Sequence, residues 1–320
     1  MEEVFTLPKL YDAYLDCRKM KRNTLNALSF DWELEKNLSF LLEELVSRKY
    51  SIGRSLCFVV EKPVIREIFA GEFRDRIIHH LFVREIECLG EAQFIYDSFA
   101  CRKGKGTHNA VKKLQKYTRS ITHNNTREAW YAQIDISGFF MAIDHSILYN
   151  LLEKIVFSAN KSMQWKSDVL FLGKKIIFSS PKENYIKKGN LSLFDLVPEK
   201  KSLFHSRTGT GLPIGNYSSQ FFANVYLNEL DQFIKRNIRC KRYIRYVDDA
   251  ILLERDKSVL IENVSLIDTF LQKNLFLSLH PKKKKFQRVN SGIDFLGYIT
   301  RPHYILARRR VVSNCKDALY

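Results

Sequence analysis

The chain has 320 residues, 45% of them hydrophobic and 27% charged, a balance that is typical of a globular protein with two or three subdomains and excludes a disordered one. No run of about 18 apolar residues occurs, and the six cysteines show no Cys-x-x-Cys spacing, so we expect no membrane span, zinc site or disulfide framework, and a cytoplasmic location. Lys and Arg outnumber Asp and Glu by 52 to 35, and the net charge of +17 favours a nucleic acid partner over a surface that is basic only for solubility.

The first part of the chain is predicted to hold helices around one pair of strands. Leucines recur at helical spacing within residues 1–50, two apolar runs between residues 55 and 69 suit strands, and an amphipathic helix is predicted from Phe73. Arg66 and Arg76 lie on or next to these elements. Because Arg can grip phosphate through two hydrogen bonds, both are candidates for phosphate contacts, with surface ion pairs as the alternative.

A basic, glycine-containing loop follows. Arg102 and two lysines alternate there with Gly104 and Gly106, just before a helix predicted to begin after Thr107. Small residues allow a ligand to approach the backbone, and a helix N-terminus favours anions. The spacing does not match a Walker A loop, so the segment is either a loop that contacts a triphosphate or a simple turn.

An acidic residue closes the next predicted strand. The strand covers residues 130–135, and its alternation places Tyr131, Gln133 and Asp135 on one face. A carboxylate at the end of a buried strand is costly unless it finds a partner. Asp135 is therefore a candidate functional residue.

Residues 157–206 are the least patterned part of the sequence. We expect a basic insertion or long loop there, with short strands at 171–178 and 190–194. A glycine-rich segment then leads into a helix that Ser218 or Ser219 would cap.

Two adjacent acids interrupt the apolar run at residues 243–253. The flanking residues suit strands, so Asp248 and Asp249 are predicted at the bend of a β-hairpin. An ordinary turn is one interpretation. The other is a metal site, because two neighbouring carboxylates repel one another and a divalent cation relieves that repulsion.

Beyond the hairpin, a helix is predicted over residues 258–279, followed by a run of lysines that includes Lys283. An apolar turn or strand pair is expected near residue 295. Three acids now stand at strand ends or turns, namely Asp135, Asp248 and Asp249. Nucleotidyl transfer with two metal ions needs such a group, and a basic chain fits a templated polymerase, although the chemistry alone also allows a nuclease.

Six blocks of the sequence, in order, resemble the motifs of reverse transcriptases over roughly residues 20–300. Tyr246-Val-Asp-Asp is similar to their Tyr-x-Asp-Asp box, and Asp135-Ile-Ser-Gly-Phe-Phe to their first-aspartate motif. The remaining blocks are Phe73-Arg-Asp-Arg-Ile-Ile, Ser98-Phe-Ala-Cys-Arg-Lys-Gly-Lys-Gly-Thr-His, Leu277-Ser-Leu-His-Pro-Lys-Lys and Phe295-Leu-Gly-Tyr.

One segment resembles a particular subfamily, the reverse transcriptases of diversity-generating retroelements. Ile214 stands where group II intron and most bacterial enzymes carry Gln, and Ser219-Gln220 replaces their Ser-Pro. That subfamily copies a template-repeat RNA, misincorporates opposite adenines and works with a small basic oligomeric accessory protein. The chemistry of this replacement also favours a less selective enzyme, because Gln can hydrogen-bond an incoming nucleotide whereas Ile offers only apolar contact. An antiphage-defence or retron-type reverse transcriptase and an impaired RNA-binding remnant are the alternatives.

The resemblance implies a role for each candidate residue. Asp135, Asp248, Asp249 and the carbonyl of Ile136 would bind two Mg²⁺ ions, for which Mn²⁺ can substitute. Phe140 would be the steric gate against a ribose 2′-hydroxyl, and Ile214 would line the nucleotide pocket. Candidates for contact with the triphosphate or template are Arg66, Arg76 and Arg102, and Lys283 is the candidate for the leaving pyrophosphate. The segment Phe295, Leu296, Gly297 and Tyr298 would form the primer grip.

The implied fold is α+β, a right-hand polymerase with helical and β fingers and an antiparallel-sheet palm packed on helices. We expect an N-terminal extension and fingers over residues 1–130, a palm over 131–298 with the basic insertion at 157–206, and a thumb stub over 299–320, because only 22 residues follow Tyr298. The expected partners are an RNA template, a DNA or RNA primer, dNTPs and the accessory protein, without a membrane, in a bacterial or phage-encoded system.

Overall fold

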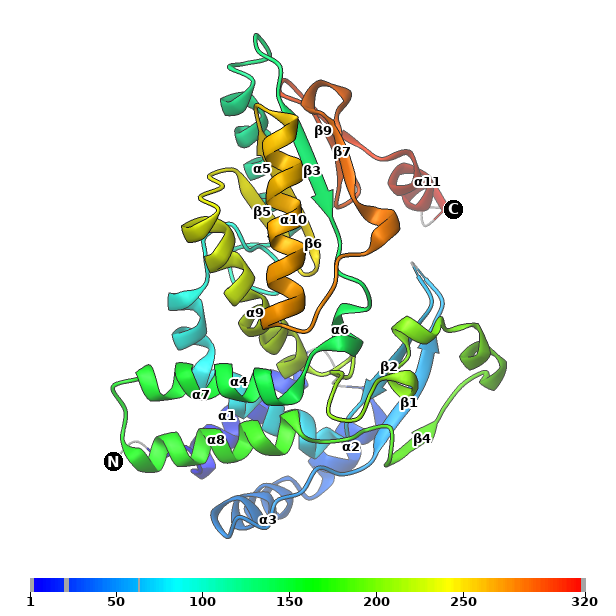
Figure 1. The fold of residues 1–320 in the computed structure, drawn as a ribbon. Coiled ribbons are helices and arrows are strands. Elements are labelled where there is room, and N and C mark those ends of the chain that lie inside the picture. The colour runs from blue at the N-terminus through cyan, green and yellow to red at the C-terminus, as the bar shows by residue number, and fades with distance from the viewer. Residues whose placement is uncertain (1–2, 20–22, 63, 318–320) are drawn as a thin grey trace. The chain divides into compact units, whose positions relative to one another are not determined.

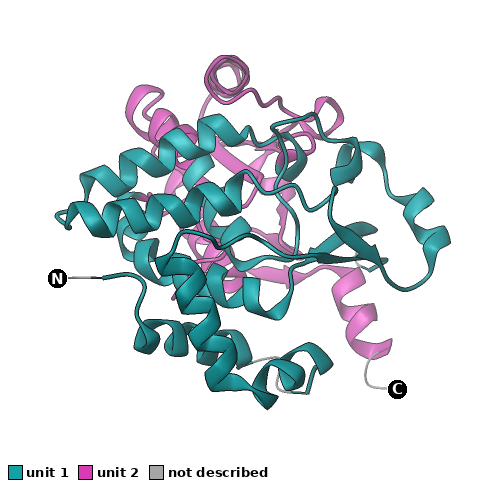
Figure 2. Cartoon of the chain, turned by 90° about the horizontal axis from the view of Figure 1, so that it is seen from below, with its two compact units in different colours: residues 1–93, 140–226 teal, residues 94–139, 227–320 magenta. Residues whose placement is uncertain are grey.

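Helices and mainly antiparallel strands make up the α+β fold. The computed structural model describes residues 3–19, 23–62 and 64–317, so residues 318–320 of the predicted thumb stub lie outside the described residues. The chain divides into two units, each built from two stretches of sequence: residues 1–93 with 140–226 form unit 1, and residues 94–139 with 227–320 form unit 2 (Figure 2). Each unit draws on both the predicted fingers and the predicted palm, so the functional subdivision of the chain stays a prediction.

Unit 1 is largely helical, as the leucine spacing predicts for its N-terminal part. Leu38, Leu41 and Leu45 are buried along one face of a single helix, the three-to-four-residue spacing that an amphipathic helix requires. The helices are α1 (Leu7–Arg18), α2 (Leu25–Trp32), α3 (Leu34–Val46), α4 (Phe73–Gln93), α7 (His145–Ser158) and α8 (Met163–Ile177). Of these, α7 and α8 lie side by side (Figure 1).

A small sheet completes unit 1. The predicted strand pair is present as β1 (Ser55–Val60) and β2 (Arg66–Ala70), which run antiparallel with Cys57 opposite Phe69. A third strand, β4 (Tyr185–Lys187), joins β1 in parallel, which gives the order β2-β1-β4.

The expectation for residues 157–206 was wrong in its details. The segment predicted as a strand at 171–178 belongs to α8, because Trp165, Val169, Leu172 and Ile176 recur at helical spacing and are buried, and the Ser162 hydroxyl caps the helix at Trp165 N, 3.1 Å away. The second predicted strand is a 3-10 helix. The short helical turns here are Leu191–Leu196, Glu199–Lys201 and Leu203–His205.

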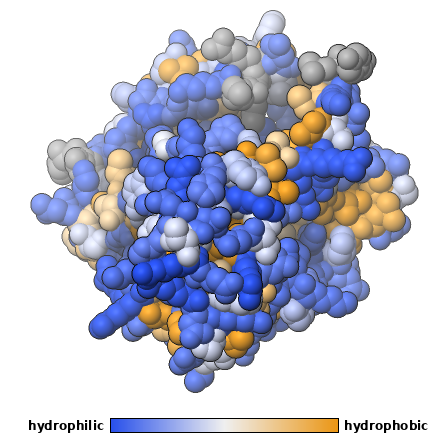
Figure 3. Space-filling model, turned by 90° about the horizontal axis from the view of Figure 1, so that it is seen from above, coloured by the Kyte–Doolittle hydropathy of each residue, from blue (hydrophilic) through white to orange (hydrophobic). Residues whose placement is uncertain are grey.

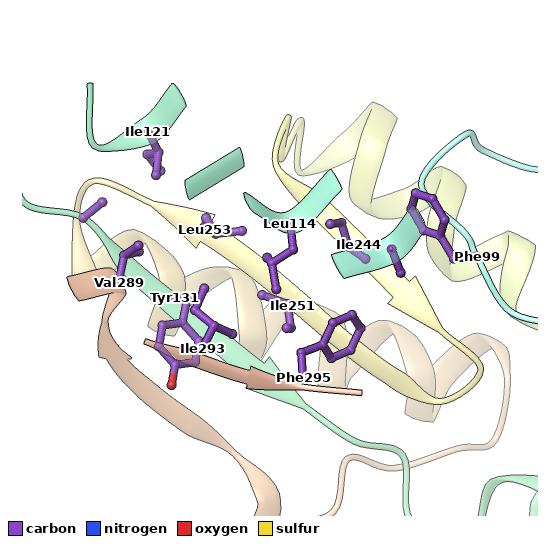
Figure 4. Close-up of a cluster of buried hydrophobic side chains, with 12 residues drawn as sticks. Phe99, Leu114, Ile121, Tyr131, Ile244, Ile251, Leu253, Val289, Ile293 and Phe295 are labelled. Carbon is purple, nitrogen blue, oxygen red and sulfur yellow. The ribbon is translucent and has the colours of Figure 1, made fainter. Parts of the chain in front are cut away.

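Unit 2 is organised around an antiparallel four-stranded sheet of order β5-β6-β3-β7. Helix α5 packs on one face and α10 on the other (Figure 1). Figure 4 shows the core under α5, in which Leu114, Ile244, Ile251 and Tyr131 belong to one buried cluster. The elements are β3 (Trp130–Ile134), β5 (Tyr243–Tyr246), β6 (Asp249–Glu254), β7 (Lys285–Arg288), α5 (Thr107–Ile121) and α10 (Lys257–Asn274).

A second small sheet and a final helix follow in unit 2. The predicted strand pair near residue 295 is confirmed, and a third strand extends it in the order β10-β9-β8. The three arginines at 308–310 lead into a helix. The elements are β8 (Ile293–Phe295), β9 (Tyr298–Thr300), β10 (Ile305–Ala307), α11 (Arg309–Asp317) and the 3-10 turns Pro281–Lys283 and Val289–Ser291.

The prediction that Ser218 or Ser219 caps the helix after the glycine-rich segment, here α9, was wrong. Helix α9 runs over Tyr217–Gln232, so Ser218 and Ser219 lie inside its first turn and do not cap it. The Ser218 hydroxyl is buried against His79, with 2.6 Å between Oγ and Nδ1. A one-turn helix, α6 (Phe139–Ala142), precedes α7, and a π-helical turn over Phe233–Asn237 follows α9.

The surface is predominantly hydrophilic where it can be inspected. On the face in Figure 3, polar residues dominate and apolar residues form separate, smaller patches. Among the described helices, none is both long and apolar enough to cross a membrane.

Candidate active site

The hairpin that carries the adjacent acids is present in unit 2. Tyr246 pairs with Asp249, so Val247 and Asp248 form a two-residue turn and Asp249 opens β6. Val247 has a φ of 55°, a conformation that hairpin turns require but that a β-branched residue adopts at a cost. The predicted hairpin is confirmed with Asp248 in its turn, but Asp249 lies in the strand that follows and Val247 is the other turn residue.

Asp135 stands beside these acids because of strand pairing. β3 runs antiparallel to β6 with Ile134 opposite Ala250, and continuing that register places Asp135 opposite Asp249. Its side chain is buried, with a residue exposure of 6%. Its carbonyl accepts a hydrogen bond from His280 N at 2.7 Å, which ties the end of β3 to the segment after α10. Residues far apart in sequence thus converge on one edge of the sheet.

The three carboxylates repel one another. Burial together with the charges of Asp135 and Asp249 raises the pKa of Asp248 to about 7. Burial and Asp135 likewise raise the pKa of Asp249 to about 6, against a partly compensating effect of Lys283. Holding all three groups ionised therefore requires positive charge at this position.

Lys283 supplies one positive charge. Its Nζ donates to Asp135 Oδ2 in an ion pair, with 58% of the lysine side chain exposed. Burial opposes protonation, but the hydrogen bond to Asp135 and the charges of the other two acids raise the pKa of Lys283. The lysine predicted to meet pyrophosphate thus lies at the acids.

These residues fit a divalent cation in their donor chemistry. Carboxylates are hard oxygen ligands, and their mutual repulsion is what such an ion relieves. In the segment of residues 135–137, the Asp135 carbonyl accepts a hydrogen bond from His280 N, and Ser137 N donates to the Ser278 carbonyl. Neither of these two hydrogen bonds involves the Ile136 carbonyl. In the described part of the chain, no three His, Cys, Asp or Glu side chains are already gathered in metal-binding geometry. In this structure, the Asp135 carboxylate forms its ion pair with the Lys283 ammonium.

Sequence reasoning missed the pair that supports the turn. Arg245 is buried at 1% exposure, and its guanidinium donates to both carboxylate oxygens of Asp231, at 2.8 and 2.6 Å. It also donates to the carbonyl of Val247 at 2.9 Å, and Tyr243 OH donates to Asp231 at 2.8 Å. Burial opposes the charge, but Asp231 raises the pKa of Arg245. The signal in the sequence was an Arg within an apolar run.

The predicted primer grip is the β8–β9 hairpin. Leu296 and Gly297 form its turn with φ of 53° and 86°, both positive as in a type I′ turn. Phe295 is in the core (Figure 4), and Tyr298 OH lies 3.1 Å from His108 Nε2 in α5. Its role in gripping a primer stays a prediction.

Two of the predicted nucleotide-contacting residues pack against the same apolar cluster in unit 1. Phe140 and Ile214 both pack against an apolar cluster that contains Cys57 and Phe69. The Ile214 carbonyl accepts from Phe69 N and the Phe140 carbonyl from Leu212 N, each at 2.8 Å. The backbone of both residues is therefore fixed within this unit.

Each of the three predicted phosphate-binding arginines is described by the contacts within its own unit. Arg66 opens β2, and Arg76 in the first turn of α4 donates to the Gly71 carbonyl at 2.8 Å, with burial lowering its pKa. Arg102 donates to the carbonyls of Ile95 and Ser98 at 2.6 and 2.8 Å. Arg102 therefore stabilises its own loop, and phosphate binding by these residues stays a prediction.

Comparison with solved structures defines the class of fold. The chain is similar to telomerase from Candida albicans in complex with the TWJ fragment of telomeric RNA, with a TM-score of 0.55 at 10% identity over 87% of this chain and 50% of that one. At this identity the likeness shows the fold alone, a mixed α+β fold with antiparallel sheets.

Comparison with sequences defines the family. The family described as "Reverse transcriptase (RNA-dependent DNA polymerase)" matches residues 63–300, which is most of the chain, and the chain belongs to that family. Protein YkfC of Escherichia coli K12 is 22% identical over 325 residues, which cover 90% of this chain and 78% of that protein. Nuclear intron maturase 1, mitochondrial, of Arabidopsis thaliana is 25% identical over 208 residues, 56% of this chain and 28% of the maturase. The chain carries the domain of an RNA-directed DNA polymerase, and its family typically uses divalent metal ions.

Proposed function

We propose that this protein is the RNA-directed DNA polymerase of a diversity-generating retroelement, which copies a template-repeat RNA into cDNA that is mutated at adenines. The observation that carries the proposal is Ile214, an apolar residue at the place of a Gln, packed in the same cluster as Phe140. A pocket wall without a polar group lacks one means of orienting the incoming base, so discrimination against a mismatch is weaker.

The catalytic group is the three carboxylates. Asp135, Asp248, Asp249 and the Ile136 carbonyl would hold two Mg²⁺ ions, which when bound activate the primer 3′-hydroxyl and stabilise the leaving pyrophosphate. Lys283 leaves Asp135 as phosphate enters and donates to the pyrophosphate oxygens, because an ammonium with a largely exposed side chain can turn between the two acceptors. Arg245 keeps the turn with Asp248 in place throughout.

The polyanionic partner is an RNA template with a DNA or RNA primer. The net charge of +17 supports this, and a telomerase of similar fold is known in complex with an RNA fragment. Phe140 excludes the 2′-hydroxyl of a ribonucleotide by its size, so the substrates are dNTPs. The small basic accessory protein completes the proposed assembly.

The test is the error spectrum of cDNA made on a defined RNA. The purified chain, with a primed RNA of balanced base composition, dNTPs and Mg²⁺, should give cDNA whose substitutions concentrate opposite template adenines. The Asp248→Ala, Asp249→Ala double variant provides the background. Errors spread equally over the four template bases would refute the retroelement assignment, and absence of cDNA with either primer type would refute the polymerase itself.

A further inference from the structure

The segment between α8 and the glycine-rich loop is docked onto the unit 1 sheet. Its strand β4 pairs with β1 from Ser55↔Tyr185 to Cys57↔Lys187, and Lys188 N donates to the Cys57 carbonyl at 2.8 Å. Residues 178–206, here called the insertion, therefore extend the sheet that also carries β2.

A buried carboxylate fastens the far end of the insertion. Glu67 on β2 is 3% exposed, and its carboxylate accepts from the Ser202 hydroxyl at 2.6 Å and from Leu203 N at 2.9 Å. Burying a carboxylate is tolerated only when it is hydrogen-bonded, and hydrogen bonds to an ionised acceptor are among the stronger ones. The two bonds fix Leu203 and its neighbours against β2.

Aromatic rings from the insertion then reach the proposed nucleotide-selecting residues. Tyr185 and Phe204 pack against Phe69, with ring centroids 6.3 and 5.4 Å from it and 5.0 Å from each other. Phe140 and Ile214 pack against the same cluster. The insertion thus forms part of the wall behind both residues.

Two glycines let the loop around Ile214 lie close to its neighbours. A Cβ on Gly211, where φ is 99°, would stand 2.7 Å from Leu203 Cδ1 of the insertion. A Cβ on Gly215, where φ is 127°, would stand 2.9 Å from the Phe69 carbonyl. Side chains at either position would clash, so the backbone on both sides of Ile214 is in close contact with the insertion and with β2.

We propose that the insertion is a specificity element of the polymerase: fastened by Glu67, it sets the positions of Ile214 and Phe140 and so determines nucleotide selection. Glu67 is a positioning residue that acts through the insertion. Close-packed walls transmit small shifts, and a displacement of about 1 Å at a reacting substrate changes rates by up to about a hundredfold. The inference rests on the proposed function and adds a structural origin for its nucleotide selectivity.

The test compares Glu67→Ala with Glu67→Gln and with Ser202→Ala. Glu67→Ala removes both acceptors, so we expect KM for dNTP to rise about tenfold, the error spectrum to change and kcat to fall less. Glu67→Gln keeps one acceptor oxygen and should recover most of the wild-type KM. Ser202→Ala removes one bond from the same carboxylate and should give a smaller shift in the same direction. Leu196→Ala, an exposed site in the insertion, is the matched control.

A uniform loss of activity, with KM and error spectrum unchanged per folded molecule, would overturn the inference and leave Glu67 with a merely structural role. Hydrogen exchange gives a readout that needs no catalysis: Glu67→Ala should speed exchange at the amides of Leu203, Gly211, Leu212, Ile214 and Gly215, and unchanged exchange there would also overturn the inference. If wild-type protein makes cDNA with evenly spread errors, the retroelement assignment fails while the KM comparison still decides the role of Glu67.

Discussion

Arg245 and Asp231 form a buried bidentate ion pair directly beneath the turn that carries Asp248, with guanidinium-to-carboxylate distances of 2.8 and 2.6 Å. A third guanidinium hydrogen bond reaches the Val247 carbonyl. Because Val247 occupies a left-handed conformation that valine disfavours, this bond opposes relaxation of the turn. The geometry of the turn that carries Asp248 therefore depends on an ion pair that is buried in the protein.

Arg245→Lys should destabilise the protein and lower kcat. Lysine keeps the charge but cannot bond Asp231 and Val247 together, so the free energy of unfolding should fall by about 3 kcal/mol. Urea unfolding and single-turnover kinetics measure the two effects. Arg242→Lys, a partly exposed arginine next to β5, is the control, and equal behaviour of the two variants would contradict the role given to Arg245.

The Asp248→Ala, Asp249→Ala double variant should make no cDNA and bind RNA nearly as well as wild type. In the proposed mechanism the carboxylates would hold the metal ions, whereas RNA affinity would come from the basic residues spread over the chain. A primer-extension assay and a filter-binding titration at several salt concentrations separate the two functions. Undiminished synthesis would remove these residues from catalysis.

Metal-free protein should lose stability as pH rises from about 4 to about 7. The pKa of Asp248 rises from 3.8 to about 7 on folding because of burial and the neighbouring acids. A carboxyl group whose pKa is higher in the folded chain binds more protons there, so its contribution is full below the unfolded pKa and is lost through the folded one. A rise of about three pKa units corresponds to a loss of at most about 4 kcal/mol.

Thermal unfolding in EDTA at pH 5 and pH 8 measures that loss. Asp248→Asn should shrink the difference between the two pH values, because the amide does not titrate. Added Mg²⁺ should raise the melting temperature of wild type mainly at pH 8. An identical pH dependence in wild type and Asp248→Asn would show that folding does not raise the pKa of Asp248.

Ile214→Gln should lower misincorporation opposite template adenine by several-fold. The amide restores a hydrogen-bonding group where Ile offers only apolar contact, and polar positioning sharpens selection. Ile214→Leu keeps size and polarity and serves as the control. Sequencing of cDNA from both variants measures the effect, and an unchanged spectrum in Ile214→Gln would exclude Ile214 from nucleotide selection.

The sequence by itself determined the local features of this protein and the family to which it belongs. Alternation over residues 130–135 gave β3 with Asp135 at its end, and the apolar runs around Asp248 gave the hairpin, because these signals lie within a few neighbouring residues. The order of the motifs gave the polymerase family, which the match over residues 63–300 confirms.

Only the tertiary structure decided which distant residues meet. Nothing local marks Asp231 as the partner of Arg245, or Ser202 as the partner of Glu67 135 positions earlier, because a buried charge requires a partner without specifying where it lies in the chain. The same holds for α8, whose buried face is defined by packing against α4 and α7 and was hidden among lysines in the sequence. Residue types and spacing thus identified the candidate catalytic group, whereas long-range burial decided which residues hold it in place.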